Sequence, residues 1–129
     1  FELINIINKN PKNLKKITKI VHPVVRKEMK LFLRKNKNKK AIVLDIPLFL
    51  ENKINLETDI LVFIDADQKK IFSKLKKRKN FNQKTFIFLK SLQMPIHMKK
   101  EKADFVVKNN FNSAKIKKEA KILLSKIIV

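Results

Sequence analysis

Apolar residues recur at helical spacing in the first third of the chain. Asn10-Pro11 favours a turn and a helix start. Beyond it lie the apolar positions Leu14, Ile17, Ile20 and Val21. Pro23 has no N–H for a helical hydrogen bond, so the pattern predicts that one helix ends near Val21 and a second runs from Pro23 to about Lys35. The polar stretch 35–40 then predicts a loop.

Three short, continuous apolar runs follow, at 41–46, 60–64 and 105–107. Such runs are typical of strands that are buried on both faces of a parallel sheet. Helical patterns accompany them, over 68–79, 82–92 and finally 113–128. Strands that alternate with helices predict an α/β fold whose parallel sheet is built through βαβ crossovers.

Ligands of parallel α/β sheets bind at the carboxyl ends of the strands. The segments just after the three runs, at 45–51, 65–68 and 108–112, are therefore the candidate functional segments. Asp45 and Glu51 could hold Mg²⁺ through water or bind a substrate hydroxyl. By spacing alone, the favoured interpretation is that they cap the turn and the next helix. Asp67 is expected to be the N-cap of the helix over 68–79.

Other polar residues have two interpretations each. Arg26 lies one turn after His22 and could bind an anion near a helix start, or the two could be a cap and a surface cation. Lys74 and Arg78, at helical i and i+4, could clamp a polyphosphate or belong to a solvated lysine-rich face. The Asn109 amide could read a base edge or stabilise a turn.

The large positive net charge is weaker evidence for nucleic-acid binding than its magnitude suggests. The net charge is +21, from 32 Lys and Arg against 11 Asp and Glu, but only 3 of the basic residues are Arg. Arg provides bidentate recognition of phosphates and bases, and the chain has no Tyr or Trp for stacking. A basic nucleic-acid-binding module stays an alternative, although we expect only weak, salt-sensitive binding to polyanions and no specific nucleic-acid partner.

The residue types that are missing exclude several sites. Without Gly the chain has neither a P-loop nor a Rossmann turn, and without Cys it has no disulfide or thiolate site. No apolar run reaches the roughly 18 residues of a membrane span, and no signal peptide is visible, so no membrane partner is expected. The chain begins at Phe1 inside an apolar pattern, and we expect it to be part of a longer protein.

The order of the motifs is more specific than any one of them. Along the chain they are His22-Pro23-x-x-Arg26, Asp45-Ile46-Pro47-Leu48-Phe49-x-Glu51, Asp59, Lys74-x-x-x-Arg78, Gln93-Met94-Pro95 and Ala103-Asp104-Phe105-Val106-x-x-Asn109. This order resembles the dephospho-CoA kinase family over roughly residues 10–129. The segments 45–51 and 93–109 are the most specific parts of the resemblance.

The resemblance implies a P-loop NTPase of the nucleoside-monophosphate-kinase-like class, with a three-layer fold around a parallel sheet. The family uses ATP and Mg²⁺ to phosphorylate the 3′-hydroxyl of dephospho-CoA, the last step of coenzyme A synthesis. Its first strand, P-loop and catalytic carboxylate precede the His-Pro helix and are absent from this chain. We therefore expect a cytoplasmic, single partial kinase domain over 1–129 that is inactive alone. Another nucleotide kinase of the same fold is an alternative.

The resemblance also implies roles for individual residues. His22 and Arg26 belong to a helical acceptor-binding region over 11–36, and Asp45, Pro47 and Glu51 lie beside the acceptor. Lys74 and Arg78 are the catalytic cations on the ATP phosphates, and Arg78 opens a lid region over 78–102. Gln93 and Lys99 belong to the return of that lid, and Asn109 lies near the adenine. No protein ligand to a metal is implied.

Three positions depart from the family's pattern. The family often has an acidic residue directly after the Arg78 position, where this chain has Lys79. Lys74 stands where the family commonly has Arg, and it cannot make the bidentate fork that Arg makes to a phosphate. The family often has Gly shortly after the Asn109 position, whereas this chain continues with Asn110, Phe111 and Asn112.

Overall fold

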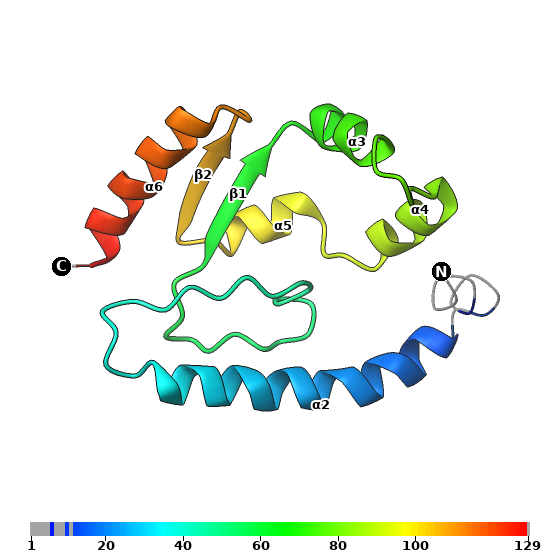
Figure 1. Ribbon diagram of the computed structural model, residues 1–129, viewed down its shortest axis with the longest axis horizontal. Coiled ribbons are helices and arrows are strands. Elements are labelled where there is room, and N and C mark those ends of the chain that lie inside the picture. The colour runs from blue at the N-terminus through cyan, green and yellow to red at the C-terminus, as the bar shows by residue number, and fades with distance from the viewer. Residues whose placement is uncertain (1–5, 7–9, 11, 129) are drawn as a thin grey trace. The chain divides into compact units, whose positions relative to one another are not determined.

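The computed structural model describes residues 6, 10 and 12–128, which divide into two compact units, 1–45 and 46–129. Each unit is considered by itself. The first contains one long helix, and the second contains the sheet with the remaining helices (Figure 1). No helix within the described part of the chain is both long enough and apolar enough to cross a membrane.

The first unit is built on helix α2, Lys12–Lys35, which is continuous through Pro23. The prediction of two helices separated at His22-Pro23 is therefore wrong. Proline removes one hydrogen bond, the one to the carbonyl of Lys19, but its fixed φ suits a helix. The apolar spacing continues in phase on both sides of it, so one interrupted hydrogen bond does not end the helix. Residues 36–40 then form turns and bends, which confirms the predicted loop.

The apolar run 41–46 is not a strand, and this prediction is also wrong. Exposure alternates along it, with residues 41, 43 and 45 exposed and residues 42, 44 and 46 partly buried. Val43 is 83% exposed. An extended segment becomes a strand only where a neighbour accepts and donates ladder hydrogen bonds, and the described residues provide no such neighbour for this run.

The second unit contains a parallel sheet of two strands, β1 (Val62–Ala66) and β2 (Phe105–Asn109). The runs at 60–64 and 105–107 are thus confirmed as parallel strands. The register pairs Val62 with Phe105 and Ala66 with Asn109, so the two carboxyl ends lie side by side. At the opposite end the Asp104 carboxylate accepts the N–H of Leu61 at 2.7 Å, and the Asp104 N–H donates to the Leu61 carbonyl at 2.9 Å. This pair of hydrogen bonds fixes the register.

Four helices accompany the sheet. They are α3 (Gln68–Lys76), α4 (Gln83–Ser91), α5 (Ile96–Glu101) and α6 (Ser113–Ile127). Three of them begin at an N-cap whose side chain accepts a backbone N–H, as preferred at helix starts: Asp67, Asn82 and Asn112. The predicted N-cap role of Asp67 is confirmed. In Figure 1, α6 runs beside β2, the strand that it contacts.

Helix α3 ends at Lys76, earlier than the predicted Lys79. The Arg78 N–H donates to the Leu75 carbonyl, so the chain turns out of the helix here. The turn brings the Phe81 ring within 5.9 Å of Phe72 and 6.1 Å of Phe86. Packing of these three rings supports the early end, because a continued helix would carry Phe81 away. Arg78 consequently lies beyond the helix, and the expected shared helical face of Lys74 and Arg78 does not form.

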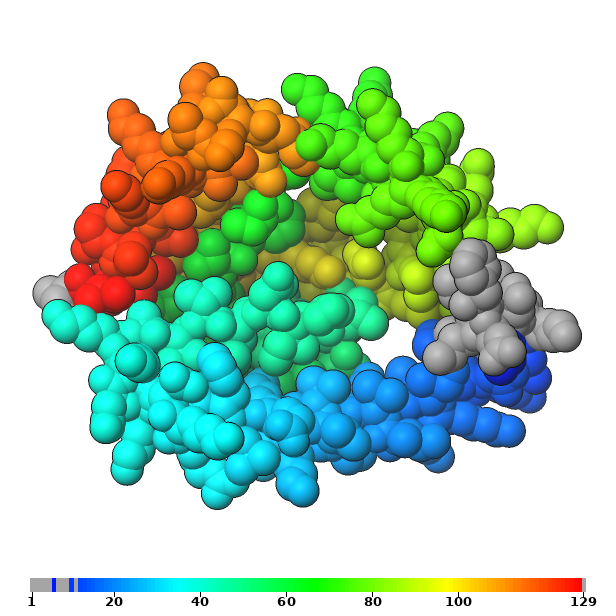
Figure 2. Space-filling model, in the orientation of Figure 1, coloured from blue at the N-terminus to red at the C-terminus, as the bar shows by residue number. Residues whose placement is uncertain are grey.

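Burial is slight throughout the described residues. Val107 of β2, at 8% exposed, is the one buried residue among them. Figure 2 shows the side chains of α3 and α4, in green, extending outward from the surface. The hydrophobic contribution to stability therefore comes from many half-buried contacts.

Candidate functional site

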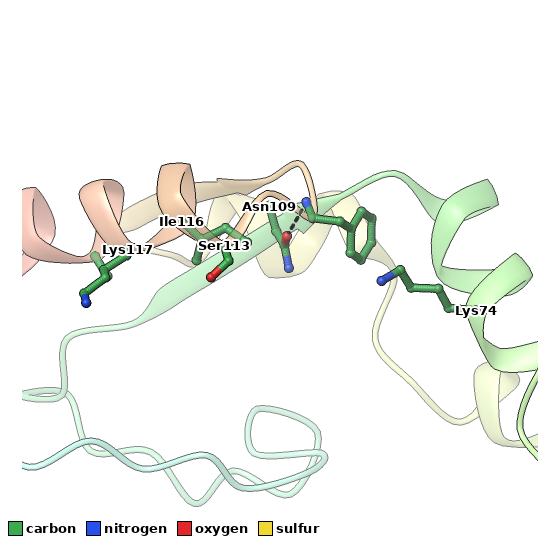
Figure 3. Close-up of a pocket in the computed structure, with 7 residues that line it drawn as sticks. Lys74, Asn109, Ser113, Ile116 and Lys117 are labelled. Carbon is green, nitrogen blue, oxygen red and sulfur yellow. Dashed lines mark hydrogen bonds between the residues drawn. The ribbon is translucent and has the colours of Figure 1, made fainter.

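A shallow pocket lies at the carboxyl end of β2. Its volume is about 430 Å³, and its lining residues are Lys74, Asn109, Phe111, Ser113, Ile116, Lys117 and Ala120. Figure 3 shows Lys74 extending from α3 toward Asn109, with Ser113, Ile116 and Lys117 of α6 on the other side. Two cations, one amide and several apolar groups thus surround one pocket. This pocket lies at the carboxyl ends of the strands, where parallel α/β folds bind ligands.

The loop after β2 orients the Asn109 amide. The N–H of Phe111 donates to Asn109 Oδ1 at 2.8 Å, and this hydrogen bond sets the orientation of the amide beside the pocket (Figure 3). Phe111 itself has a φ of 62°, in the left-handed region that favours Gly. Gly would adopt this backbone conformation more easily than Phe does.

Lys74 contacts Phe111, and both residues line the pocket. The Lys74 Nζ lies 4.6 Å from the centre of the Phe111 ring, within the range of a cation–π interaction. Arg78, the second cation expected to contact phosphates, is exposed and does not line the pocket. The structure therefore brings Lys74 and Asn109 to one pocket without Arg78.

A second cluster joins two segments that are far apart in sequence. Glu51 Oε1 accepts a hydrogen bond from Lys99 Nζ at 2.6 Å and another from the N–H of Met94 at 2.8 Å. Only 13% of the Glu51 side chain and 23% of the Lys99 side chain are exposed, so water screens this pair less than it screens a surface ion pair. The predicted residues Glu51 and Lys99 thus meet, next to Gln93.

Opposing effects act on the pKa of Glu51. Burial raises the pKa, whereas hydrogen bonds from Lys99, from the N–H of Met94 and from its own backbone N–H lower it, as does the charge of Lys99. The lowering effects prevail, and the pKa of Glu51 lies below its ordinary value. Glu51 is therefore a carboxylate at neutral pH, and one of its oxygens accepts two hydrogen bonds.

Helix α5 has a second ion pair. Lys100 Nζ lies 3.0 Å from Asp65 Oδ2, at the end of β1, and this pair is more exposed than the Glu51–Lys99 pair. The consecutive residues Lys99 and Lys100 thus connect α5 to the turn that contains Glu51 and to the end of β1. Asp65 and Asp67 both have structural partners, since Asp65 pairs with Lys100 and Asp67 caps α3.

Two other candidate site residues, His22 and Arg26, lie on α2 in the first unit. A surface pocket of about 390 Å³ is lined by Thr18, Lys19, His22, Pro23 and Arg26. His22 and Arg26 share this surface because they are four positions apart on one helix. Asp45, at the end of this unit, and Pro47, at the start of the turns in the second unit, are both exposed.

The sequence model of the dephospho-CoA kinase family matches residues 2–115, which is most of the chain. The chain belongs to the dephospho-CoA kinase family. The match includes Glu51 and Lys99, and it includes the β2 pocket apart from Ile116, Lys117 and Ala120.

Curated relatives named dephospho-CoA kinase agree with this family. The chain is 28% identical to one from Wolbachia sp. subsp. Brugia malayi, over 89% of this chain and 60% of the relative. It is 35% identical to one from Bartonella henselae, over 79% of this chain and 53% of the relative. It is 24% identical to one from Leptospira interrogans, over 98% of this chain and 61% of the relative. The chain thus spans little more than half the length of these dephospho-CoA kinases.

Several contacts in this chain of the dephospho-CoA kinase family were not predicted from the sequence. Phe111 and Lys117 line the β2 pocket, Lys100 pairs with Asp65, and Asp104 fixes the strand register. Lys100 and Lys117 could not be distinguished among so many lysines. Phe111 carried one usable signal, because an aromatic residue directly after Asn109-Asn110 follows the end of a predicted parallel strand.

Proposed function

We propose that the chain is part of an ATP-dependent kinase that phosphorylates the 3′-hydroxyl of dephospho-CoA to give coenzyme A. Membership of the dephospho-CoA kinase family, over residues 2–115, is the observation that carries the proposal. The proposed fold of the whole enzyme is the nucleoside-monophosphate-kinase-like P-loop fold, and its proposed location is the cytoplasm. The small parallel sheet described above is compatible with that fold.

The β2 pocket supports an ATP site. We assign Asn109 to the adenine and Lys74 to the phosphates. The pocket has an amide donor, apolar walls at Phe111 and Ile116, and cations at Lys74 and Lys117, which suits a nucleotide with a flat base and negative charge. Arg78, just beyond α3, is assigned to the same phosphates, and the segment 78–102 to the lid.

The acceptor side is assigned to the helical region 11–36, with His22 and Arg26, and to Asp45, Pro47 and Glu51. The pocket along α2 supports the first part of this assignment. The contact of Glu51 with Lys99 connects the acceptor-side turn to the return of the lid, Gln93 and Lys99, within the second unit. Closure of the lid and fixing of the acceptor would then be coupled through one carboxylate.

The chemistry requires parts beyond these residues. The sequence has no Gly, so it has no P-loop to cradle the phosphates. Among the described residues no three His, Cys, Asp or Glu side chains are grouped to hold a metal ion, and we assign no protein ligand to Mg²⁺. Mg²⁺ commonly binds nucleotide phosphates and water with few protein ligands. We propose that the 129 residues alone do not transfer phosphate.

The test compares two proteins with the same assay. The complete product of the reading frame that encodes the chain should convert dephospho-CoA and ATP to coenzyme A, whereas the purified 129 residues should not. Nucleoside monophosphates serve as competing acceptors. Failure of the complete product with dephospho-CoA, or a preference for a nucleoside monophosphate, would overturn the proposed function. Turnover by the 129 residues, free of contaminating kinase, would overturn only their proposed inactivity.

A further inference from the structure

The contact between Lys74 and Phe111 joins two elements that are distant in sequence. Lys74 lies on α3 and Phe111 in the loop between β2 and α6, and the Lys74 Nζ is 4.6 Å from the Phe111 ring centre. Two other lysines lie over rings: Lys76 over Phe72 and Lys90 over Phe86. Each of those pairs is four positions apart on one helix, where such contacts are common. The Lys74–Phe111 contact has no such local cause.

The backbone conformation of Phe111 determines where its ring lies. A bulky residue with φ of 62° is unfavourable because Cβ crowds the neighbouring carbonyl. The N–H of Phe111 is bound to Asn109 Oδ1, and its half-buried ring lines the β2 pocket. A hydrogen bond and a packing contact thus hold Phe111 in a conformation that Gly would adopt without strain.

We propose that Phe111 is the positioning residue for Lys74. Its ring holds the Lys74 ammonium at the pocket so that the cation already faces the position of the nucleotide phosphates. The proposal rests on the proposed function, in which Lys74 contacts those phosphates.

The chemistry of the two side chains explains the pairing. Lysine is a point charge on a flexible four-carbon stem, and it lacks the planar fork that orients Arg on a phosphate. A ring face attracts the ammonium through its quadrupole and uses no hydrogen-bond acceptor, so the N–H donors of Lys74 stay available for phosphate oxygens. An exposed contact of this kind corresponds to about a two- to five-fold change in an equilibrium constant.

Kinetics of the complete reading-frame product test the proposal through substitutions at position 111. Phe111→Gly keeps the left-handed backbone and the N–H to Asn109 but removes the ring; Phe111→Leu keeps an apolar side chain without a ring; Phe111→Tyr keeps the ring. We expect the Gly and Leu variants to raise the KM for ATP about two- to five-fold, with an unchanged KM for dephospho-CoA. The Tyr variant should behave as the wild type.

The decisive comparison is made in a Lys74→Met background. There Phe111→Leu should cause no further rise in the KM for ATP, because no ammonium is left to position. An equal rise in both backgrounds would overturn the proposal and show that the ring acts on the nucleotide directly. Lys76→Gln is the matched control, since Lys76 lies on the same helix over another ring and outside the pocket.

A measurement on the 129 residues without ligand separates this proposal from the proposed function. Ring currents should move the Lys74 ε-methylene proton resonances upfield in the wild type and in Phe111→Tyr, but not in Phe111→Leu. Absence of the upfield shift in the wild type would overturn the positioning contact, whatever the enzyme's activity. A clear shift together with no turnover by the complete product would overturn the proposed function instead.

Discussion

The two units differ in how far apart in sequence their hydrogen-bonded residues lie. In the first unit, side-chain hydrogen bonds of Asn13, Thr18 and Asn36 reach only three to seven positions along the chain. In the second unit, hydrogen bonds from Leu61 to Asp104 and from Met94 to Glu51 join positions 43 apart. A helix such as α2 depends on its own residues, whereas the second unit depends on a few contacts between distant segments. Substitutions should therefore affect the two units differently.

The largest expected effect is that of a charge in the centre of the sheet. Val107→Asp should destabilise the second unit by at least about 3 kcal/mol, because it removes a buried apolar side chain and buries a carboxylate without a partner. Hydrogen exchange resolved by residue should show lost protection in β1, β2 and α6 but unchanged protection in α2.

Val106→Asp is the matched control for this substitution. Val106 is the preceding residue of the same strand and is 42% exposed, so its substitution should cost less than about 1 kcal/mol. Equal effects of the two substitutions would contradict the assignment of the core to Val107. Equal loss of protection in α2 would mean that the stability of α2 depends on the second unit.

The next effect concerns the first unit alone. Pro23→Ala should stabilise α2 by up to about 3 kcal/mol, because it restores the helical hydrogen bond to the Lys19 carbonyl. Circular dichroism at the helix band should report higher helicity and a higher melting temperature. Pro47→Ala, at a turn in the second unit, should leave helicity unchanged. A fall in helicity with Pro23→Ala would mean that the proline is required by contacts other than those of the helix.

The smallest of these effects is a pH dependence in the second unit. Since folding lowers the pKa of Glu51, its stabilisation is complete above the ordinary value of 4.5 and is lost as the pH falls through the lowered pKa. Glu51→Gln should cost about 1–2 kcal/mol at pH 7 and progressively less below pH 4.5. Urea unfolding of the wild type and of Glu51→Gln at pH 7 and pH 3 measures the loss of stability at each pH.

Glu119→Gln, at an exposed position of α6, is the control for the Glu51 substitution. It should leave the stability at pH 7 unchanged. If Glu51→Gln lost the same stability at both pH values, the loss would come from packing rather than from the carboxylate charge.

Local patterns were sufficient to predict the elements whose causes are local. The apolar runs at 60–64 and 105–107 became β1 and β2, and Asp67 became an N-cap because its carboxylate needs only the N–H three residues on. The parallel arrangement followed from the alternation of strands and helices. The candidate residues Glu51 and Lys99 were found by motif, but their mutual contact was not.

The predicted break at Pro23 overestimated the effect of one lost helical hydrogen bond, and the other errors arose where distant partners decide the structure. The run 41–46 has the composition of a strand, but a strand also needs a neighbour, which composition does not reveal. The end of α3 depends on Phe81 packing against Phe72, and the pocket role of Phe111 depends on a left-handed φ and on Lys74. Charge patterns alone could not distinguish the lysines with partners from the many that face water.

The sheet register has a consequence for the order in which the chain folds. Leu61 and Asp104 must come together across 43 positions, and closing a loop of that length costs about 3 kcal/mol of chain entropy before any ladder hydrogen bond forms. A helix such as α2 forms within about a microsecond. At roughly 5–20 residues per second, a ribosome takes about 2–9 seconds to deliver the partner strand after β1. During that interval the edge of β1 is open to other copies of this chain, and the net charge of +21 on each copy opposes their approach.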